Sequence, residues 1–197
     1  MAGEVLVALM VFAFVTSVTP GPNNLMLMAS GANFGFGRTV PHMLGISLGH
    51  GVMVFLVGLG IGELFRTLPL LAPLLKLAAT AYMLWLAWKI ARAAPPEGGA
   101  AAGRPFSFAQ AAAFQWVNPK AWAMAVTATT VYAPGQGWAA MAVVAAVFAA
   151  VNLPSVSVWT VIGQELRRVL TNPARLRAFN VTMALGLVAS LWPVLQM

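Results

Sequence analysis

Two polar, proline-containing segments lie inside otherwise apolar stretches and hold the residues best suited to bind a ligand. They are Thr19–Asn24 (TPGPNN) and Gln115–Lys120 (QWVNPK). Proline removes a backbone donor and clashes with the carbonyl one turn earlier, so each segment should break its helix. Within lipid, a break is tolerated only against protein or a water-filled cavity. Each segment therefore predicts a polar pocket, and the alternative is that the prolines merely kink packed helices.

Lys120 is the most consequential of these residues. It lies about twelve residues from either end of a predicted span over 109–131, roughly 17 Å from either surface on a straight helix, which is too deep for comfortable snorkelling. An ammonium at this depth should face a pocket and act in binding or coupling. The alternative is that 107–116 is interfacial, which would leave Lys120 at the surface. Lys76 is only about seven residues past Pro69, and a snorkelling side chain is the simpler interpretation for it.

The two segments together offer groups that could bind a small polar ligand. Lys120 and the backbone amides of a half-helix that starts after a proline could hold an anionic group, and asparagine side chains could hold other polar groups. The predicted substrate-binding residues are Asn23, Asn24, Asn118 and Lys120. The predicted hinges, about which one half of the protein would tilt, are Pro20, Gly21, Pro22 and Pro119.

Several further polar residues fall within apolar stretches. His42 and His50 could titrate in a proton-coupled cycle, and the alternative is that each only packs within the bundle. Gln115, Asn152 and Ser155 could line the same cavity, and for the last two a helix-packing hydrogen bond is an equal alternative.

Enzymatic and metal chemistry have little support. The chain has no Asp and no Cys, and its four Glu residues fall at predicted span ends or in loops. There is no HExxH, no phosphate-binding glycine loop and no plausible Ser, His and carboxylate set. The sequence therefore predicts no catalytic site, no metal and no cofactor, and it offers no buried carboxylate to neutralise a cationic substrate.

The elements that must position these residues are membrane helices. Hydrophobic residues make up 60% of the chain and charged residues only 8%, and the mean hydropathy is +0.84. The ranges 5–37, 39–62, 121–164 and 178–197 carry no charged side chain, and about 20 apolar residues suffice to cross a bilayer. We predict an all-α integral membrane protein with six spans, at 5–32, 40–62, 69–90, 109–131, 138–162 and 178–196.

The two broken helices fall at equivalent places in this scheme. One is the first span of the first three, and the other is the first span of the last three, so the two halves must cross the membrane in opposite senses. We therefore predict a six-helix bundle of two inverted three-helix repeats, 1–94 and 109–197, joined by a cytoplasmic loop at 95–108. Interrupted helices at matching positions of such halves indicate a transporter binding site near the midplane.

The net charge of +7 would suggest nucleic acid in a soluble protein, but here the basic residues fall between apolar segments, where they set orientation. The loops after the first, third and fifth spans carry Arg38, Lys89, Arg92, Arg104, Arg167, Arg168, Arg175 and Arg177, and the other side carries Arg66. If the positive loops are cytoplasmic, both termini lie outside. The predicted partners are a small molecule and the lipid bilayer, not nucleic acid.

The segments Thr19–Leu25 (TPGPNNL) and Asn118–Ala121 (NPKA), in a six-span chain of this length, resemble the LysE/RhtB superfamily of amino-acid exporters. The resemblance implies proton-motive-force-dependent efflux of amino acids from a bacterial cytoplasm, a place in the inner membrane, and a homodimer. The lack of Asp and of any mid-span carboxylate favours the neutral branch, with homoserine-like or threonine-like substrates.

Two other functions stay open at this stage. The same architecture could carry another metabolite or an ion, or the chain could be a membrane scaffold that transports nothing. A polar midplane cavity between the broken helices would argue against the scaffold, and a dry apolar contact there would favour it.

Overall fold

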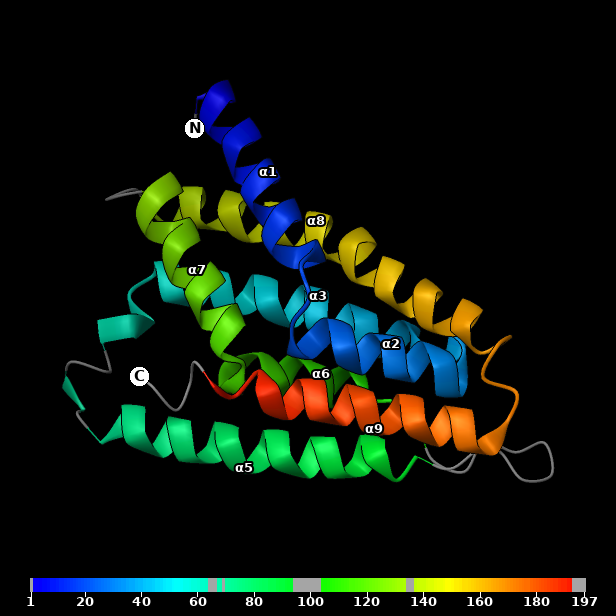
Figure 1. The fold of residues 1–197 in the computed structure, drawn as a ribbon. Helices are drawn as coiled ribbons and strands as arrows, with labels where there is room; N and C mark the ends of the chain where they lie inside the picture. Colours follow the sequence, from blue (N-terminus) through cyan, green and yellow to red (C-terminus); the bar gives the residue numbers. More distant parts are fainter. Residues whose placement is uncertain (1, 64–66, 69, 94–103, 134–136, 193–197) are drawn as a thin grey trace.

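The computed structural model describes residues 2–63, 67–68, 70–93, 104–133 and 137–192, and within these ranges the chain forms helices and no strands (Figure 1). Two short 3-10 turns lie at Ile61–Glu63 and Gln115–Val117. The α-helices are α1 (Gly3–Val18), α2 (Pro22–Phe34), α3 (Phe36–Gly58), α5 (Leu71–Ala91), α6 (Phe108–Phe114), α7 (Pro119–Tyr132), α8 (Trp138–Leu166) and α9 (Pro173–Ala189). The all-α prediction is confirmed for the described residues.

The first predicted break separates α1 from α2, which meet at an angle of 56°. Gly21 is fully extended, and Pro22 then occupies the first turn of α2, where its missing N–H is no loss because that group has no intrahelical partner. The second break falls within the span predicted at 109–131. There α6 passes into the 3-10 turn Gln115–Val117, Asn118 is extended, and Pro119 starts α7.

Asparagine followed by proline starts two of the helices. The Asn118 side chain accepts a hydrogen bond from the Lys120 N–H, and the Asn172 side chain accepts one from the Ala174 N–H. Such caps satisfy amides that the first helical turn leaves without partners. The cap at Asn172 explains why α9 begins before residue 178, the start that the charge pattern suggested.

Three described helices, α3, α5 and α8, are long and apolar enough to cross a membrane, and the bent pair of α1 and α2 makes a fourth candidate. The pieces α6 and α7 are each short, and α9 has 17 residues. These lengths give three or four candidate spans among the described residues, while the complete six-helix, two-repeat arrangement stays a prediction. Most of the predicted loop 95–108 and the Arg66 position lie outside the described residues.

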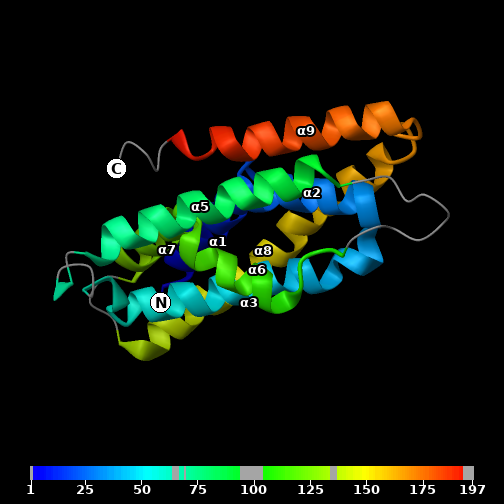
Figure 2. The same ribbon diagram turned by 90° about the horizontal axis from the view of Figure 1, so that it is seen from below.

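The helices pack as a layered bundle in which α3 contacts α8, α5 contacts α9, and α8 also contacts both α1 and α2. In Figure 2, α5 and α9 run side by side along one face of the bundle. A tight reversal at Gly35, which has a φ of 81°, joins α2 to α3. That positive φ suits glycine because it has no Cβ to clash.

Buried apolar side chains form two large clusters. The first, here called the α2–α6 cluster, comprises Met26, Leu27, Met43, Ile46, Met83, Leu86, Ala87, Phe106, Ala111, Phe114, Val156, Ala184, Leu187 and Leu191. The second, the α1–α7 cluster, comprises Leu9, Ala13, Met53, Val54, Val57, Ala121, Met124, Ala125, Ala128, Ala133, Met141, Val144, Ala145 and Phe148. The polar segments of the two broken helices lie between these clusters in the chain.

The described basic loop residues gather at one end of the bundle. The C-terminal ends of α2, α5 and α8 lie there together with the N-terminal ends of α3 and α9 (Figures 1 and 2). These helix ends and their connections carry Arg38, Lys89, Arg92, Arg104, Arg167, Arg168, Arg175 and Arg177. We call this the basic end, and its charge is what the positive-inside rule expects of a cytoplasmic face.

Candidate functional site

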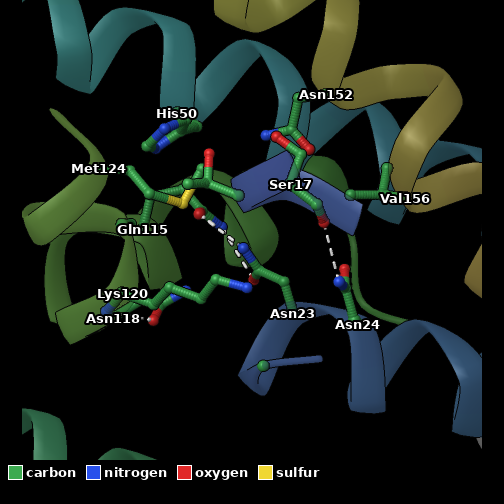
Figure 3. Close-up of a pocket in the computed structure, with 13 residues that line it drawn as sticks. Ser17, Asn23, Asn24, His50, Gln115, Asn118, Lys120, Met124, Asn152 and Val156 are labelled. Atoms are coloured by element: carbon green, nitrogen blue, oxygen red, sulfur yellow. Dashed lines mark hydrogen bonds between the residues drawn. The ribbon is translucent and has the colours of Figure 1, made fainter. Parts of the chain in front are cut away.

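A small polar cavity lies where the two broken helices meet (Figure 3). Its volume is about 20 Å³, which is room for a single water molecule, since one water needs about 10–15 Å³. The residues that line it come from α1, α2, α3, α7, α8 and the segments at the two breaks: Thr16, Ser17, Gly21, Asn23, Asn24, His50, Gln115, Asn118, Lys120, Ala121, Met124, Asn152 and Val156.

This cavity lies between the two apolar clusters. On α3, His50 is placed between Ile46 of the α2–α6 cluster and Met53 of the α1–α7 cluster. On α8, Asn152 likewise falls between members of the two clusters. Packed side chains therefore flank the polar site on two sides, while Lys120 and Gly21 are half-buried and the Lys120 hydrogen bonds to Thr19 and Pro20 are exposed. The cavity is too small for a ligand larger than water, so such a ligand can bind only if the surrounding helices move apart.

Two amide side chains join the broken helices directly. Asn23 Nδ2 donates to Gln115 Oε1 at 2.9 Å, and Gln115 Nε2 donates back to Asn23 Oδ1 at 3.2 Å (Figure 3). Gln115 Nε2 also donates to the Ala111 carbonyl at 2.9 Å, and the glutamine is completely buried. The pair therefore fixes the start of α2 relative to the 3-10 turn that precedes α7.

The amide pair yields the first prediction. Asn23→Leu leaves the completely buried Gln115 amide without this partner, and Gln115→Leu does the same to the half-buried Asn23 amide, so each should destabilise the folded protein by about 1–3 kcal/mol. The double variant should cost less than the sum, with a coupling energy of about 0.6–2 kcal/mol. Unfolding of the purified protein in detergent measures this cycle. The control is Thr182→Val, whose hydroxyl bonds only within its own helix, and strict additivity would contradict the pairing.

Side chains from other helices satisfy the carbonyls at the broken end of α1. Asn24 Nδ2 donates to the carbonyls of Ser17, at 2.9 Å, and Thr19, at 2.7 Å. Trp159 Nε1, on α8, donates to the Val18 carbonyl at 3.0 Å. A helix end inside a membrane needs such donors because lipid supplies none. These hydrogen bonds connect the C-terminal end of α1 to α2 and α8.

Lys120 completes this arrangement from α7. Its Nζ donates to the Thr19 carbonyl at 2.7 Å, to Thr19 Oγ1 at 3.0 Å and to the Pro20 carbonyl at 3.3 Å. The side chain passes over Gly21, where an added Cβ would lie 2.8 Å from Lys120 Cδ. All three oxygens are uncharged, so the hydrogen bonds satisfy the ammonium donors without neutralising the positive charge.

The structure brings together most of the residues that the sequence singled out. Asn23, Asn24, Asn118, Lys120, Gly21, His50, Gln115 and Asn152 all line the cavity, and the prolines at 20, 22 and 119 stand at the two breaks. Ser155 does not line it, because its hydroxyl turns back to the Val151 carbonyl of its own helix at 2.8 Å. His42 lines a different cavity.

Sequence reasoning missed several lining residues. Thr16, Ser17, Met124 and Val156 also contribute to the cavity wall. Ser17 had a signal that was available, since a small polar residue two positions before a predicted break is well placed to reach a midplane pocket. Met124 and Val156 had none, because an apolar residue in an apolar helix looks the same whether it faces lipid, a core or a cavity.

Comparison with known proteins identifies the family. The sequence model of the LysE type translocator family matches residues 14–189. The chain belongs to this family. The proteins named cysteine/O-acetylserine efflux protein in Escherichia coli strain K12 and in Shigella sonnei are 32% identical to this LysE type translocator over 191 residues, covering 95% of this chain and 96% of theirs. A protein of the same name in Shigella flexneri is 33% identical over 180 residues, or 90% of each chain.

No solved structure matches this translocator. Family membership, together with the apolar helices, makes the chain a multi-pass protein of the inner membrane and a transporter, not an enzyme. The resemblance noted from the two proline-containing segments is therefore confirmed, and so is the expectation of an amino-acid exporter at the level of the family.

Proposed function

We propose that this translocator exports a small neutral amino acid and binds it in the cavity between the two broken helices. The observation that carries the proposal is the Lys120 ammonium, which lies at the junction of both breaks and is held only by uncharged oxygens. A half-buried cation that has no compensating anion among its hydrogen-bond partners favours an anionic ligand group. The carboxylate of an amino acid supplies that group.

The surrounding donors and acceptors fit the rest of a zwitterion. The N-terminal turns of α2 and α7 direct backbone amides and the positive ends of their helix dipoles toward the break. The carbonyls of Thr19 and Pro20, which now accept from Lys120, could accept from a substrate ammonium once the lysine turns to the carboxylate. Asn23, Asn24 and Asn118 would bind the remaining polar atoms.

The substrate class follows from charge. No described residue that lines the cavity is Asp or Glu, so nothing there would neutralise a second positive charge on lysine or arginine. A neutral amino acid with a small polar side chain fits best, including homoserine-like and threonine-like compounds. Cysteine and O-acetylserine, which name the efflux proteins of Escherichia coli and Shigella, belong to the same chemical class.

Transport would alternate access between the two faces. In this proposal, separation of the helices around either apolar cluster would widen the cavity and open it to one side of the membrane. We propose that two inverted three-helix repeats, residues 1–94 and 109–197, tilt about Pro20–Pro22 and Pro119. The contacts between α3 and α8, and between α5 and α9, support this pairing of repeats. In this proposal both termini lie outside, and the protein is a homodimer.

Proton antiport is the proposed energy source, with His50 as the proton carrier. Its ring lies in the wall of the cavity, neither of its nitrogens has a hydrogen-bond partner, and it stacks edge-on at 5.3 Å from Phe148 of the α1–α7 cluster. A histidine between the substrate and the α1–α7 cluster is well placed to couple its protonation to the opening of that cluster. His42, the other proton-coupling candidate, lies in a separate cavity.

Reconstituted vesicles test this function. A panel of amino acids, including O-acetylserine, cysteine, threonine and lysine, would be measured for counterflow with and without an uncoupler. We expect a neutral compound to be transported, lysine to be rejected, and the imposed pH gradient to drive net flux in the parent protein but not in His50→Asn. Transport of only an inorganic ion or a non-amino-acid metabolite would favour the second function, and no flux of any compound would favour the scaffold.

A further inference from the structure

A second, larger cavity opens at the basic end of the bundle. Its volume is about 260 Å³, compared with about 20 Å³ for the cavity between the breaks. In the conformation that the structure shows, this cavity has room for a small organic molecule. Its wall is formed by the C-terminal halves of α2 and α5, the start of α3 and the segment before α6: Met26, Ala29, Ser30, Asn33, Phe34, His42, Trp88, Lys89, Ile90, Arg92, Ala93, Arg104, Pro105 and Phe106.

Three cations line this cavity, and none of its described lining residues is Asp or Glu. The Lys89 ammonium lies 5.3 Å from the Phe106 ring centroid, and the Arg92 guanidinium lies 4.8 Å from the ring centroid of Trp88. Arg104 is the third cation. Aromatic faces hold cations in place without cancelling their charge, so the cavity keeps a positive field that attracts anionic groups.

A buried polar side chain without a partner gives an independent sign of a ligand. His42 is 1% exposed, lines the cavity, and neither Nδ1 nor Nε2 has a hydrogen-bond partner. Its ring lies 5.2 Å from that of Phe106. Leaving a buried polar group unsatisfied costs about 1–3 kcal/mol, and a bound polar molecule would recover that cost. His42 comes from α3, while the three cations come from the C-terminal end of α5 and the segment before α6.

The two cavities lie one after the other along the same helices. His42 and His50 are eight residues apart on α3, roughly 12 Å along the axis, and they line the second and the first cavity respectively. On α2, Asn23 and Asn24 line the first, whereas Ser30 and later residues line the second. The α2–α6 cluster separates them, since its Met26 lines one cavity and its Val156 the other.

We propose that the cavity at the basic end is a loading site, which binds the carboxylate of a small amino acid before the α2–α6 cluster opens to admit it to the Lys120 site. The inference rests on the proposed export function. Arg92, Arg104 and Lys89 attract the carboxylate, and His42 forms a hydrogen bond with the polar end that enters first. A low-affinity site of this kind raises the local substrate concentration beside the α2–α6 cluster.

The chemistry favours an amino acid over the phosphate of a lipid headgroup. A headgroup remains attached to its acyl chains and would be held at the rim by the exposed cations alone. The unpartnered His42 is instead buried in the cavity wall. A free small molecule can reach both the cations and this buried histidine.

Single cysteines can test the loading site, because the chain contains none. Ala93→Cys puts a thiol on the cavity wall. Gly37→Cys is the matched control, since it is exposed at the same basic end, has nothing within 4 Å of its Cβ and lies outside the cavity. Both variants would be reconstituted in phosphatidylcholine vesicles. Their labelling by a membrane-permeant maleimide would then be timed with O-acetylserine or threonine, or with the methyl ester of either.

We expect the free amino acid to slow labelling of Ala93→Cys but not of Gly37→Cys, and the ester, which lacks the carboxylate, to have little effect. Adding Arg104→Gln should raise the half-protecting concentration about tenfold, the loss expected for a charge-assisted contact. His42→Leu should also raise the half-protecting concentration, although this variant keeps all three cations. Equal protection by acid and ester, or protection of both cysteines alike, would overturn the loading site.

Two further arms separate the alternatives. If phosphatidylglycerol alone protects Ala93→Cys and the amino acids add nothing, the cavity binds lipid headgroups and the loading site is overturned. If O-acetylserine and threonine protect this cysteine but no amino acid is transported, the proposed function fails while the binding site stands. Transport of either compound without protection by it would overturn the loading site alone.

Discussion

Lys120→Gln is expected to remove most amino-acid efflux at low internal substrate concentration while the protein remains folded. Glutamine keeps an amide that can donate to the carbonyls at the end of α1, but it has no charge to offer a substrate carboxylate. A hydrogen bond to a charged group contributes about 1.5–3 kcal/mol, so substrate affinity should fall by about 10–100-fold, since each 1.4 kcal/mol is about tenfold. Efflux from proteoliposomes, measured over a range of internal substrate concentrations, checks this.

Two companion variants separate binding from structural support. Lys76→Gln removes a lysine on α5 that does not line the cavity, and efflux should be unchanged. Lys120→Arg keeps the charge but replaces a compact ammonium with a planar fork, and it should retain partial activity. Thermal unfolding in detergent completes the test. Unchanged efflux in Lys120→Gln would remove this residue from the mechanism, and equal losses of stability and efflux in both Lys120 variants would reduce it to a cap on α1.

The breaks could be predicted from the sequence because their causes are local. Pro20 and Pro22 interrupt a helix through their own ring geometry, and Asn118 with Pro119 forms a cap and a first turn that any helix can use. The polarity of the site could also be predicted, since asparagine and lysine within an apolar stretch need partners. Local chemistry therefore located both the interruption and the kind of side chain beside it.

The partners of these residues could not be predicted, because they depend on how each helix is rotated and how far it slides. Lys120 reaches across to Thr19 on α1, and Gln115 pairs with Asn23, yet no spacing in the sequence connects those positions. Ser155 shows the opposite outcome. It lies three residues from Asn152 on α8, but its hydroxyl bonds within its own helix. Helical spacing predicts a shared face, and only packing decides which member of the face meets the cavity.

The histidines show a related limit. His42 and His50 look alike in the sequence, since both are isolated imidazoles within a few residues of a glycine in one apolar span. Packing nevertheless places them in two cavities on opposite sides of the α2–α6 cluster. The helix α3 thus connects the proposed loading site with the Lys120 site. The α2–α6 cluster between them, and not either polar site alone, would set the order of the transport steps.

The close approach of α2 to α8 depends on two glycines, and filling either position should destabilise the protein strongly. An added Cβ at Gly31 would fall against the Thr160 carbonyl, and one at Gly163 would fall against the Met28 carbonyl. Both obstacles are backbone atoms, which cannot turn aside as a side chain can, so the helices must separate. Gly163→Ala should lower the free energy of unfolding by about 1–3 kcal/mol, the usual cost of overpacking.

Gly37→Ala is the matched control for this prediction. Its Cβ would meet nothing within 4 Å, so the alanine should gain about 0.4–1 kcal/mol from a less flexible unfolded chain. The changes in the free energy of unfolding, measured in detergent, should have opposite signs in Gly37→Ala and Gly163→Ala. This difference separates the effect of the α2–α8 contact from that of helix propensity. Because α2 carries Asn23 and Asn24 into the cavity and α8 carries Asn152, Gly163→Ala should also lose efflux. Full stability and full efflux in Gly163→Ala would show that this contact does not position the site.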